Sequence, residues 1–141
     1  MELDKQCTFC EDLATNQSAT EKDSTNVLDF GKHGDDTLRR MSWGVKVTGT
    51  ASDATCTSDC TVAWVTSDSA TFASGNVTLF SKAFDDAKVV KGAWLIKDEP
   101  LPRGLKRYNK LTFTNEASKA GYPDVSAWVY DGRDDGTPYK G

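Results

Sequence analysis

LPRGLKRYNKLTFT, residues 101–114, combines a turn with the start of a β-strand. Pro102 fixes its own φ angle and favours an extended conformation for Leu101, and Gly104 permits a tight bend. From Leu105 onward the side chains can alternate between two faces. One face carries Leu105, Arg107, Asn109, Leu111 and Phe113, and the other carries Lys106, Tyr108, Lys110, Thr112 and Thr114. This alternation predicts a strand that is half buried at its end and faces solvent or a partner at its start.

The same stretch holds the densest basic cluster of the chain, formed by Arg103, Lys106, Arg107 and Lys110. The chain as a whole is acidic, with a formal net charge of -4. A basic cluster on an acidic protein predicts either a solvated edge of a sheet or a contact surface.

Further strands are predicted wherever apolar and polar residues alternate, or where a short apolar run lies between turn signals. They cover residues 25–30, 41–47, 60–65, 77–84, 89–96 and 125–130. CTVAWV, residues 60–65, reads as a strand buried on both faces, and Gly92 reads as a bulge or a site of close approach. Short strands separated by polar turns predict an all-β fold, a single-domain antiparallel β-sandwich that is jelly-roll-like.

Length and charge narrow the class of protein. At 141 residues we expect one domain over residues 1–141, with a short N-terminal arm (1–10) and an irregular C-terminal tail (131–141). The negative net charge argues against a general nucleic-acid binder. No apolar run is long enough to suggest a membrane span, and the acidic N-terminus does not resemble a secretory signal. We therefore expect no nucleic-acid or membrane partner and synthesis in a cytoplasm.

Four cysteines leave three alternatives open. Cys7 and Cys10 form a C-x2-C pair, and Cys56 and Cys60 form a C-x3-C pair. Such spacings could place four thiolates around zinc if a turn lies between the members of each pair. Disulfides are a second alternative. In a reducing cytoplasm, plain reduced thiols are the interpretation we prefer, with no metal.

Four predicted strands each carry one tryptophan: Trp43, Trp64, Trp94 and Trp128. Flat rings lined up on one face could stack against sugars, whereas the alternative is core packing or anchoring of an interface. Core packing is favoured, because Trp43 shares its face with Met41, Val45 and Val47.

Catalytic motifs are not evident in the sequence, so we expect a protein that is not an enzyme, with no catalytic residues and no cofactor. The single histidine, His33, lies in the glycine-rich segment GKHGDD beside two aspartates. A general base or metal ligand there would need a second functional group, so a solvated loop residue is the preferred interpretation.

Several stretches, in order along the chain, resemble the small capsid cement (stabilisation) proteins of tailed bacteriophages, the family typified by the cement protein of a Bordetella podovirus. The matching residues are Leu3, Asp4, Lys5, Gln6 and Phe9; Ser24 to Gly31; Thr66, Ser67, Asp68 and Phe72; Leu101, Pro102, Gly104, Leu105, Arg107, Tyr108 and Leu111; and Asp131 with Tyr139. The chain departs from the family pattern in its cysteines, its four tryptophans and the polar segment 49–59.

The resemblance implies a jelly-roll-like sandwich on the outer capsid surface of a virion, assembled in the host cytoplasm, which clamps neighbouring major capsid protein subunits. It also implies a small homo-oligomer, with a dimer favoured over a trimer. The candidate capsid or self contacts are Arg103, Lys106, Arg107 and Tyr108, together with Leu3, Asp4 and Lys5 of the arm. The alternatives are that Arg107 packs its stem within the sandwich while the lysines solvate an edge strand, and that the protein is a carbohydrate-binding β-sandwich.

Overall fold

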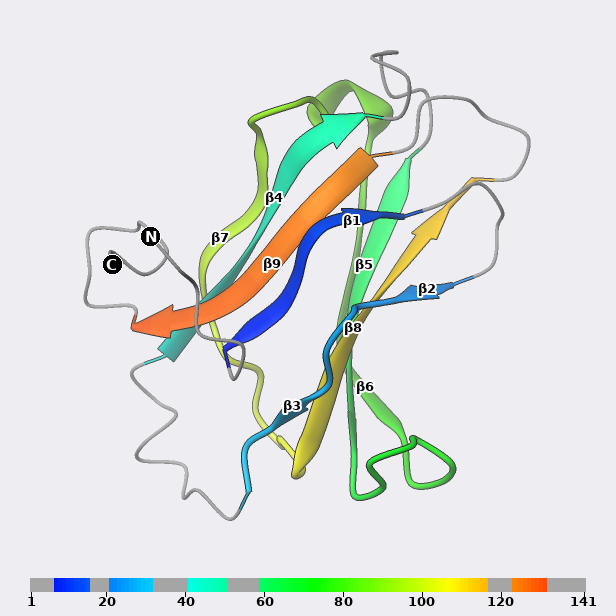
Figure 1. The fold of residues 1–141 in the computed structure, drawn as a ribbon, viewed down its shortest axis with the longest axis vertical. Coiled ribbons are helices and arrows are strands. Elements are labelled where there is room, and N and C mark those ends of the chain that lie inside the picture. The colour runs from blue at the N-terminus through cyan, green and yellow to red at the C-terminus, as the bar shows by residue number, and fades with distance from the viewer. Residues whose placement is uncertain (1–6, 16–20, 32–40, 51–58, 117–122, 132–141) are drawn as a thin grey trace.

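The computed structural model describes residues 7–15, 21–31, 41–50, 59–116 and 123–131 (Figure 1). Within these ranges the regular structure is almost entirely β. The strands are β1 (Thr8–Ala14), β2 (Lys22–Asp23), β3 (Leu28–Asp29), β4 (Met41–Thr50), β5 (Cys60–Ser67), β6 (Val77–Phe84), β7 (Trp94–Pro100), β8 (Tyr108–Asn115) and β9 (Pro123–Asp131), and one 3-10 turn, η2 (Asp86–Lys88), precedes β7. In the described part of the chain, no helix is long and apolar enough to span a membrane.

The strands form two antiparallel sheets that pack face to face. Sheet A has the order β1-β9-β4-β7, and sheet B has the order β2-β8-β5-β6, with β3 also paired to β8. The first and last strands of the described chain are neighbours in sheet A, where Thr8 pairs with Trp128. The predicted all-β antiparallel sandwich is therefore confirmed, and the jelly-roll connection of its strands stays a prediction.

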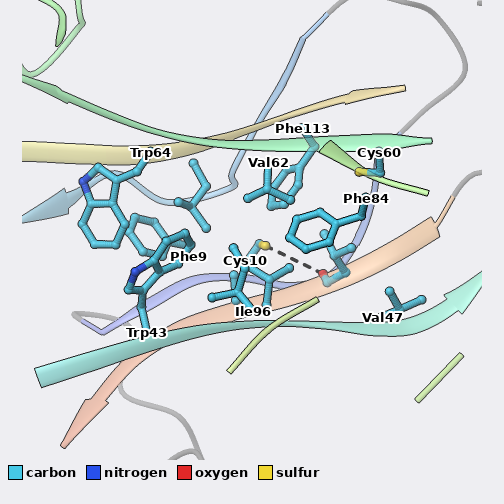
Figure 2. Packing of buried hydrophobic residues seen from close by; sticks show 14 of the residues in the cluster. Phe9, Cys10, Trp43, Val47, Cys60, Val62, Trp64, Phe84, Ile96 and Phe113 are labelled. Carbon is cyan, nitrogen blue, oxygen red and sulfur yellow. Dashed lines mark hydrogen bonds between the residues drawn. The ribbon is translucent and has the colours of Figure 1, made fainter. Parts of the chain in front are cut away.

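An aromatic cluster fills the space between the sheets (Figure 2). Trp43 from β4 and Trp64 from β5 are both fully buried, and their rings meet edge to face at 5.0 Å. Phe9 from β1 meets Trp64 at 5.0 Å, and Phe80 from β6 meets Trp43 at 5.1 Å. Each such contact contributes about 0.5–1.5 kcal/mol beyond the burial of the rings. One contact network thus joins strands of both sheets.

Alternation and short apolar runs between turn residues located three of the strands well. The prediction for residues 77–84 matches β6, and those for 41–47 and 125–130 lie within β4 and β9. In β4 the side chains of Trp43, Val45 and Val47 all point into the core, as their shared face predicted. Sheet B covers this face, and its Trp64 lies against Trp43.

Three predictions about strands were wrong. β5 is not buried on both faces, since Thr61, Ala63 and Val65 are half exposed on the outer face of sheet B. Residues 89–93 form a turn before β7, in which Gly92 has a φ of +87° and donates its N–H to the Val47 carbonyl. This hydrogen bond ends the β4–β7 ladder, so Gly92 is a turn residue and not a strand bulge.

The domain boundaries also need correction. Residues 8–10 belong to β1 and not to an arm, because the chain pairs there with β9 and buries Thr8, Phe9 and Cys10. At the other end, Asp131 closes β9 by pairing with Met41. The remainder of the predicted arm and tail, residues 1–6 and 132–141, lies outside the described residues, as does His33.

Candidate interaction surface

The turn of residues 101–108 is fastened to the sheet beneath it by Lys106. Its backbone N–H donates to Thr66 Oγ1 at 2.7 Å, and its Nζ donates to the Gly75 carbonyl at 2.9 Å. The same ammonium lies 3.4 Å from a carboxylate oxygen of Asp68. Because Thr66 is in β5 and Gly75 is in the loop between β5 and β6, Lys106 joins the turn to β5 and to the loop that leads into β6. Its role here is structural as well as electrostatic.

Arg107 lies on the outside of the molecule and pairs with Asp29 of β3. Its Nε donates to Asp29 Oδ1 at 2.9 Å and a terminal nitrogen donates to Oδ2 at 3.1 Å, which is the bidentate geometry that a guanidinium favours. The guanidinium carbon is also 5.0 Å from the ring centre of Tyr108. The hydrogen bonds to Asp29 raise the pKa of Arg107 above its ordinary value, so the guanidinium keeps its charge.

Lys110, on β8, makes a third ion pair. Its Nζ is 3.1 Å from Asp23 Oδ2 of β2 and 4.6 Å from the ring centre of Phe72, a half-buried residue of the 67–76 loop. Phe72 has a φ of +58°, a left-handed conformation that a bulky side chain rarely adopts. The cation–π contact holds this ring against the outer face of sheet B.

Carboxylates therefore balance most of the predicted basic cluster. Lys106, Arg107 and Lys110 face Asp68, Asp29 and Asp23 respectively. Arg103 differs, because it is exposed at the tip of the turn and has no ion pair with another described residue. Such exposed or partly exposed pairs contribute little to stability, but they fix where the side chains lie.

The alternative interpretation of the basic cluster, in which Arg107 packs its stem within the sandwich while the lysines solvate an edge strand, is wrong in both parts. β8 is an interior strand, flanked by β5 on one side and by β2 and β3 on the other, so the lysines do not solvate an edge. Arg107 does not pack its stem within the sandwich, since 51% of its side chain is exposed. The strand also begins at Tyr108 and not at Leu105, because the preceding residues form the turn. Leu3, Asp4 and Lys5 lie outside the described residues.

The cysteines do not gather at the surface. Cys10 and Cys60 are buried in the core, and Cys10 donates its thiol to the Val125 carbonyl at 3.7 Å (Figure 2). Burial raises the pKa of the Cys10 thiol to about 12, so the thiol is protonated at neutral pH. Cys7 is half buried, and Cys56 lies outside the described residues. Among the residues that the structure describes, no group of three or more His, Cys, Asp or Glu could hold a metal ion.

The tryptophans do not form a lined-up platform for sugars. Trp43 and Trp64 are fully buried between the sheets, in agreement with the preferred core interpretation. Trp94 and Trp128 pack against each other at 5.3 Å with their planes 64° apart, so their faces are not coplanar. Trp128 is only 6% exposed. Trp94 is half buried and is the most exposed of the four tryptophans, and the ammonium groups of Lys46 and Lys97 lie over its ring.

The sequence analysis missed the partners of the basic cluster. Asp29 lies 78 residues before Arg107 and Asp23 lies 87 residues before Lys110. Asp23 has polar neighbours in the sequence and Asp29 lies between Leu28 and Phe30, and no local pattern links either residue to β8. Neither a protein-family model nor a curated protein matches this chain, so its resemblance to phage cement proteins stays a prediction.

Proposed function

We propose that this protein is a structural virion protein that binds the outer surface of a phage capsid and cements neighbouring major capsid protein subunits. The observation that carries the proposal is the 101–108 turn, which presents Arg103, Arg107 and Tyr108 on a support that is already ordered. Arginine and tyrosine are favoured anchors of protein interfaces. A clamp needs such anchors and a complementary surface more than it needs reactive groups.

Order in the free protein supports this use of the turn. The Lys106 hydrogen bonds to Thr66 and Gly75, and the paired Arg107–Asp29 hydrogen bonds, hold the turn before any partner arrives. Each long side chain that is ordered only on binding costs about 0.5–1.5 kcal/mol of affinity. A surface ordered in advance avoids part of this cost. On a shell, many copies of a moderate interface then add to a large stabilisation.

We also infer a jelly-roll connection for the sandwich. β2 and β3 both pair with β8 and are separated by only four residues, 24–27, so they act as one interrupted strand. The sandwich then has eight strands, four in each sheet. The orders β1-β9-β4-β7 and β2-β8-β5-β6 support two interlocked Greek keys, which is the arrangement that defines a jelly roll.

The test is co-sedimentation of the purified protein with capsids that lack it, followed by heating of the decorated and bare shells. We expect saturable binding at a fixed ratio to the major capsid protein, and a higher disruption temperature for decorated shells. Arg103→Glu should weaken binding by at least about tenfold while leaving the fold intact. Lys106→Glu is a poorer probe, because it would also break the clamp to Gly75.

The matched control is Lys91→Glu, which makes the same kind of charge reversal at an exposed residue of the turn before β7. It should leave capsid binding unchanged. If neither the wild-type protein nor the control bound to shells, the cement role would be wrong. If Arg103→Glu bound as well as wild type, the assignment of the 101–108 turn as the contact surface would be wrong. Binding of free glycans with quenching of Trp94 fluorescence would instead support the carbohydrate-binding alternative.

A further inference from the structure

The sandwich has four outer strand positions: β1 and β7 flank sheet A, and β2 with β3 and β6 flank sheet B. An outer strand exposes a row of backbone N–H and C=O groups that can pair with another chain. Natural proteins usually interrupt such edges with bulges, charges, prolines or very short strands. Whether each edge of this protein carries such an interruption can be read from its strand pairing.

Three of the four edges are interrupted. β1 has two shifts of register against β9, and Asp12 within it has a φ of +48°. β7 has two shifts against β4, contains Lys97, Asp98 and Glu99 in succession, and ends at Pro100. β2 and β3 are two residues long each. None of these edges offers a long regular row of free backbone groups.

β6 is different. It is eight residues long and pairs with β5 along its whole length, from Cys60 with Phe84 to Thr66 with Val77, with a single shift of register. Lys82 is its one charged residue. Its other edge pairs with none of the described strands. Five of its residues are exposed. One of them is Val77, which is 42% exposed and is one of the few exposed large apolar residues in the described part of the chain.

We propose that β6 is the surface at which a second copy of this chain binds, by antiparallel pairing of the two β6 strands about a two-fold axis. The five-stranded sheet B would then continue into the five strands of sheet B of the second copy. A two-fold axis brings two identical edges together, so each satisfies the free backbone groups of the other. Because the pairing occupies the β6 edge of each copy, no free β6 edge remains and the assembly stops at a dimer.

The side chains of β6 suit self-pairing centred on Ser81. Residues directly opposite in an antiparallel pair point to the same face, so a two-fold axis through Ser81 sets Lys82 opposite Phe80 of the partner subunit. Lys82 and Phe80 share the face towards sheet A, since they pair with the buried Val62 and Trp64. An ammonium beside an aromatic ring is favourable, and this register avoids placing the two Lys82 side chains opposite each other.

Ser81 supplies the test, because it is exposed and lies opposite its own copy in this register. Wild-type protein, measured by sedimentation equilibrium between about 1 and 100 µM, should reach twice the chain mass. Ser81→Lys and Ser81→Asp should each raise the dissociation constant of the dimer about fivefold, through like-charge repulsion across the axis. An equimolar mixture of the two variants should form a heterodimer that is tighter than either homodimer.

The matched control is Ser74→Lys, the same chemical change at an exposed serine in the loop before β6. It should dimerise like wild type. Hydrogen exchange provides a second readout, in which β6 amides gain protection as the protein concentration rises. A wild-type chain that stays monomeric throughout this range would overturn the proposal, as would a dimer that Ser81→Lys and Ser81→Asp leave unchanged. These measurements contain no capsid, so their outcome is independent of the proposed cement role.

Discussion

The Asn109→Ala substitution removes three hydrogen bonds that join the core of the sandwich to the 101–108 turn. Asn109 is fully buried at the start of β8. Its Oδ1 accepts a hydrogen bond from Trp64 Nε1 at 3.0 Å, and its Nδ2 donates to the carbonyls of Lys106 at 3.0 Å and Arg107 at 3.3 Å. One side chain thus satisfies a buried indole and holds the chain as it leaves the turn.

The expected loss of stability follows from what each partner can do afterwards. Trp64 is fully buried, so its N–H would have no acceptor, at a cost of about 1–3 kcal/mol. The Arg107 carbonyl still accepts a hydrogen bond from the Phe30 N–H at 2.9 Å, and the Lys106 carbonyl belongs to a half-exposed turn residue, so each loss should cost only about 0.5 kcal/mol. The sum is about 3 kcal/mol, which lowers the melting temperature of a domain of this size by about 10 °C.

Urea denaturation followed by circular dichroism measures this loss. The control is Thr114→Ala on the same strand, where the side chain is half exposed and the expected change is below about 0.5 kcal/mol. A double-mutant cycle with Trp64→Phe should show a coupling of about 1 kcal/mol or more, because Asn109 then has no indole to accept from. A loss below about 1 kcal/mol for Asn109→Ala would refute the reasoning that this hydrogen bond is needed in the core.

Two further predictions concern close packing and a buried thiol. Gly44→Ala should cost about 1–3 kcal/mol in chemical denaturation, because a Cβ there would lie 2.9 Å from the Trp94 ring and 3.1 Å from the Ile96 carbonyl oxygen. Gly49→Ala on the same strand should cost less, because its nearest neighbour is the carboxylate of Asp124 at 3.3 Å, which can move; equal costs would contradict the argument. The pKa of Cys10 is raised from 9.0 to about 12, so the folded state binds this proton more tightly than the unfolded state does, and stability should fall as the pH rises from about 9 to 12. Cys10→Ala should reduce this slope, and the native thiol should resist disulfide reagents at pH 8 until the protein unfolds; rapid labelling of Cys10 in the native state would argue against its burial.

Some of the fold was predictable because it depends on local pattern. β4 alternates between large apolar residues and small or polar residues, which is the period of two of a strand, and β6 and β9 contain short apolar runs between turn residues. β1 escaped prediction because its register shifts against β9 twice, which breaks the alternation of TFCEDLA. β2 escaped because two residues are too few to form a pattern, and the strand predicted over residues 25–30 is only the two-residue β3 (Leu28–Asp29). For these strands only pairing with a distant strand identifies the conformation.

The candidate interaction surface was likewise predictable only in part. The basic cluster and its proline–glycine turn are visible in the sequence, and so is the acidity of the rest of the chain. Its pairing with Asp29, Asp23 and Asp68 is not, since these residues meet β8 and the turn only after sheet B has formed. A cluster that looked free in the sequence is therefore mostly neutralised, and Arg103 is the exception.

The sequence by itself determined that the protein is an all-β sandwich and which residues of its central strands face inward, because alternation and turn residues act over a few positions. Only the tertiary structure decided which strands lie at the edges, with β8 in the interior of sheet B and β6 at its edge. Strand order depends on hydrogen bonds between segments far apart in the chain, and a local pattern contains no information about which segment will be the neighbour. The same physical reason explains why the free edge of β6 could be identified only once the sheets were assembled, whereas the basic turn was visible in the sequence.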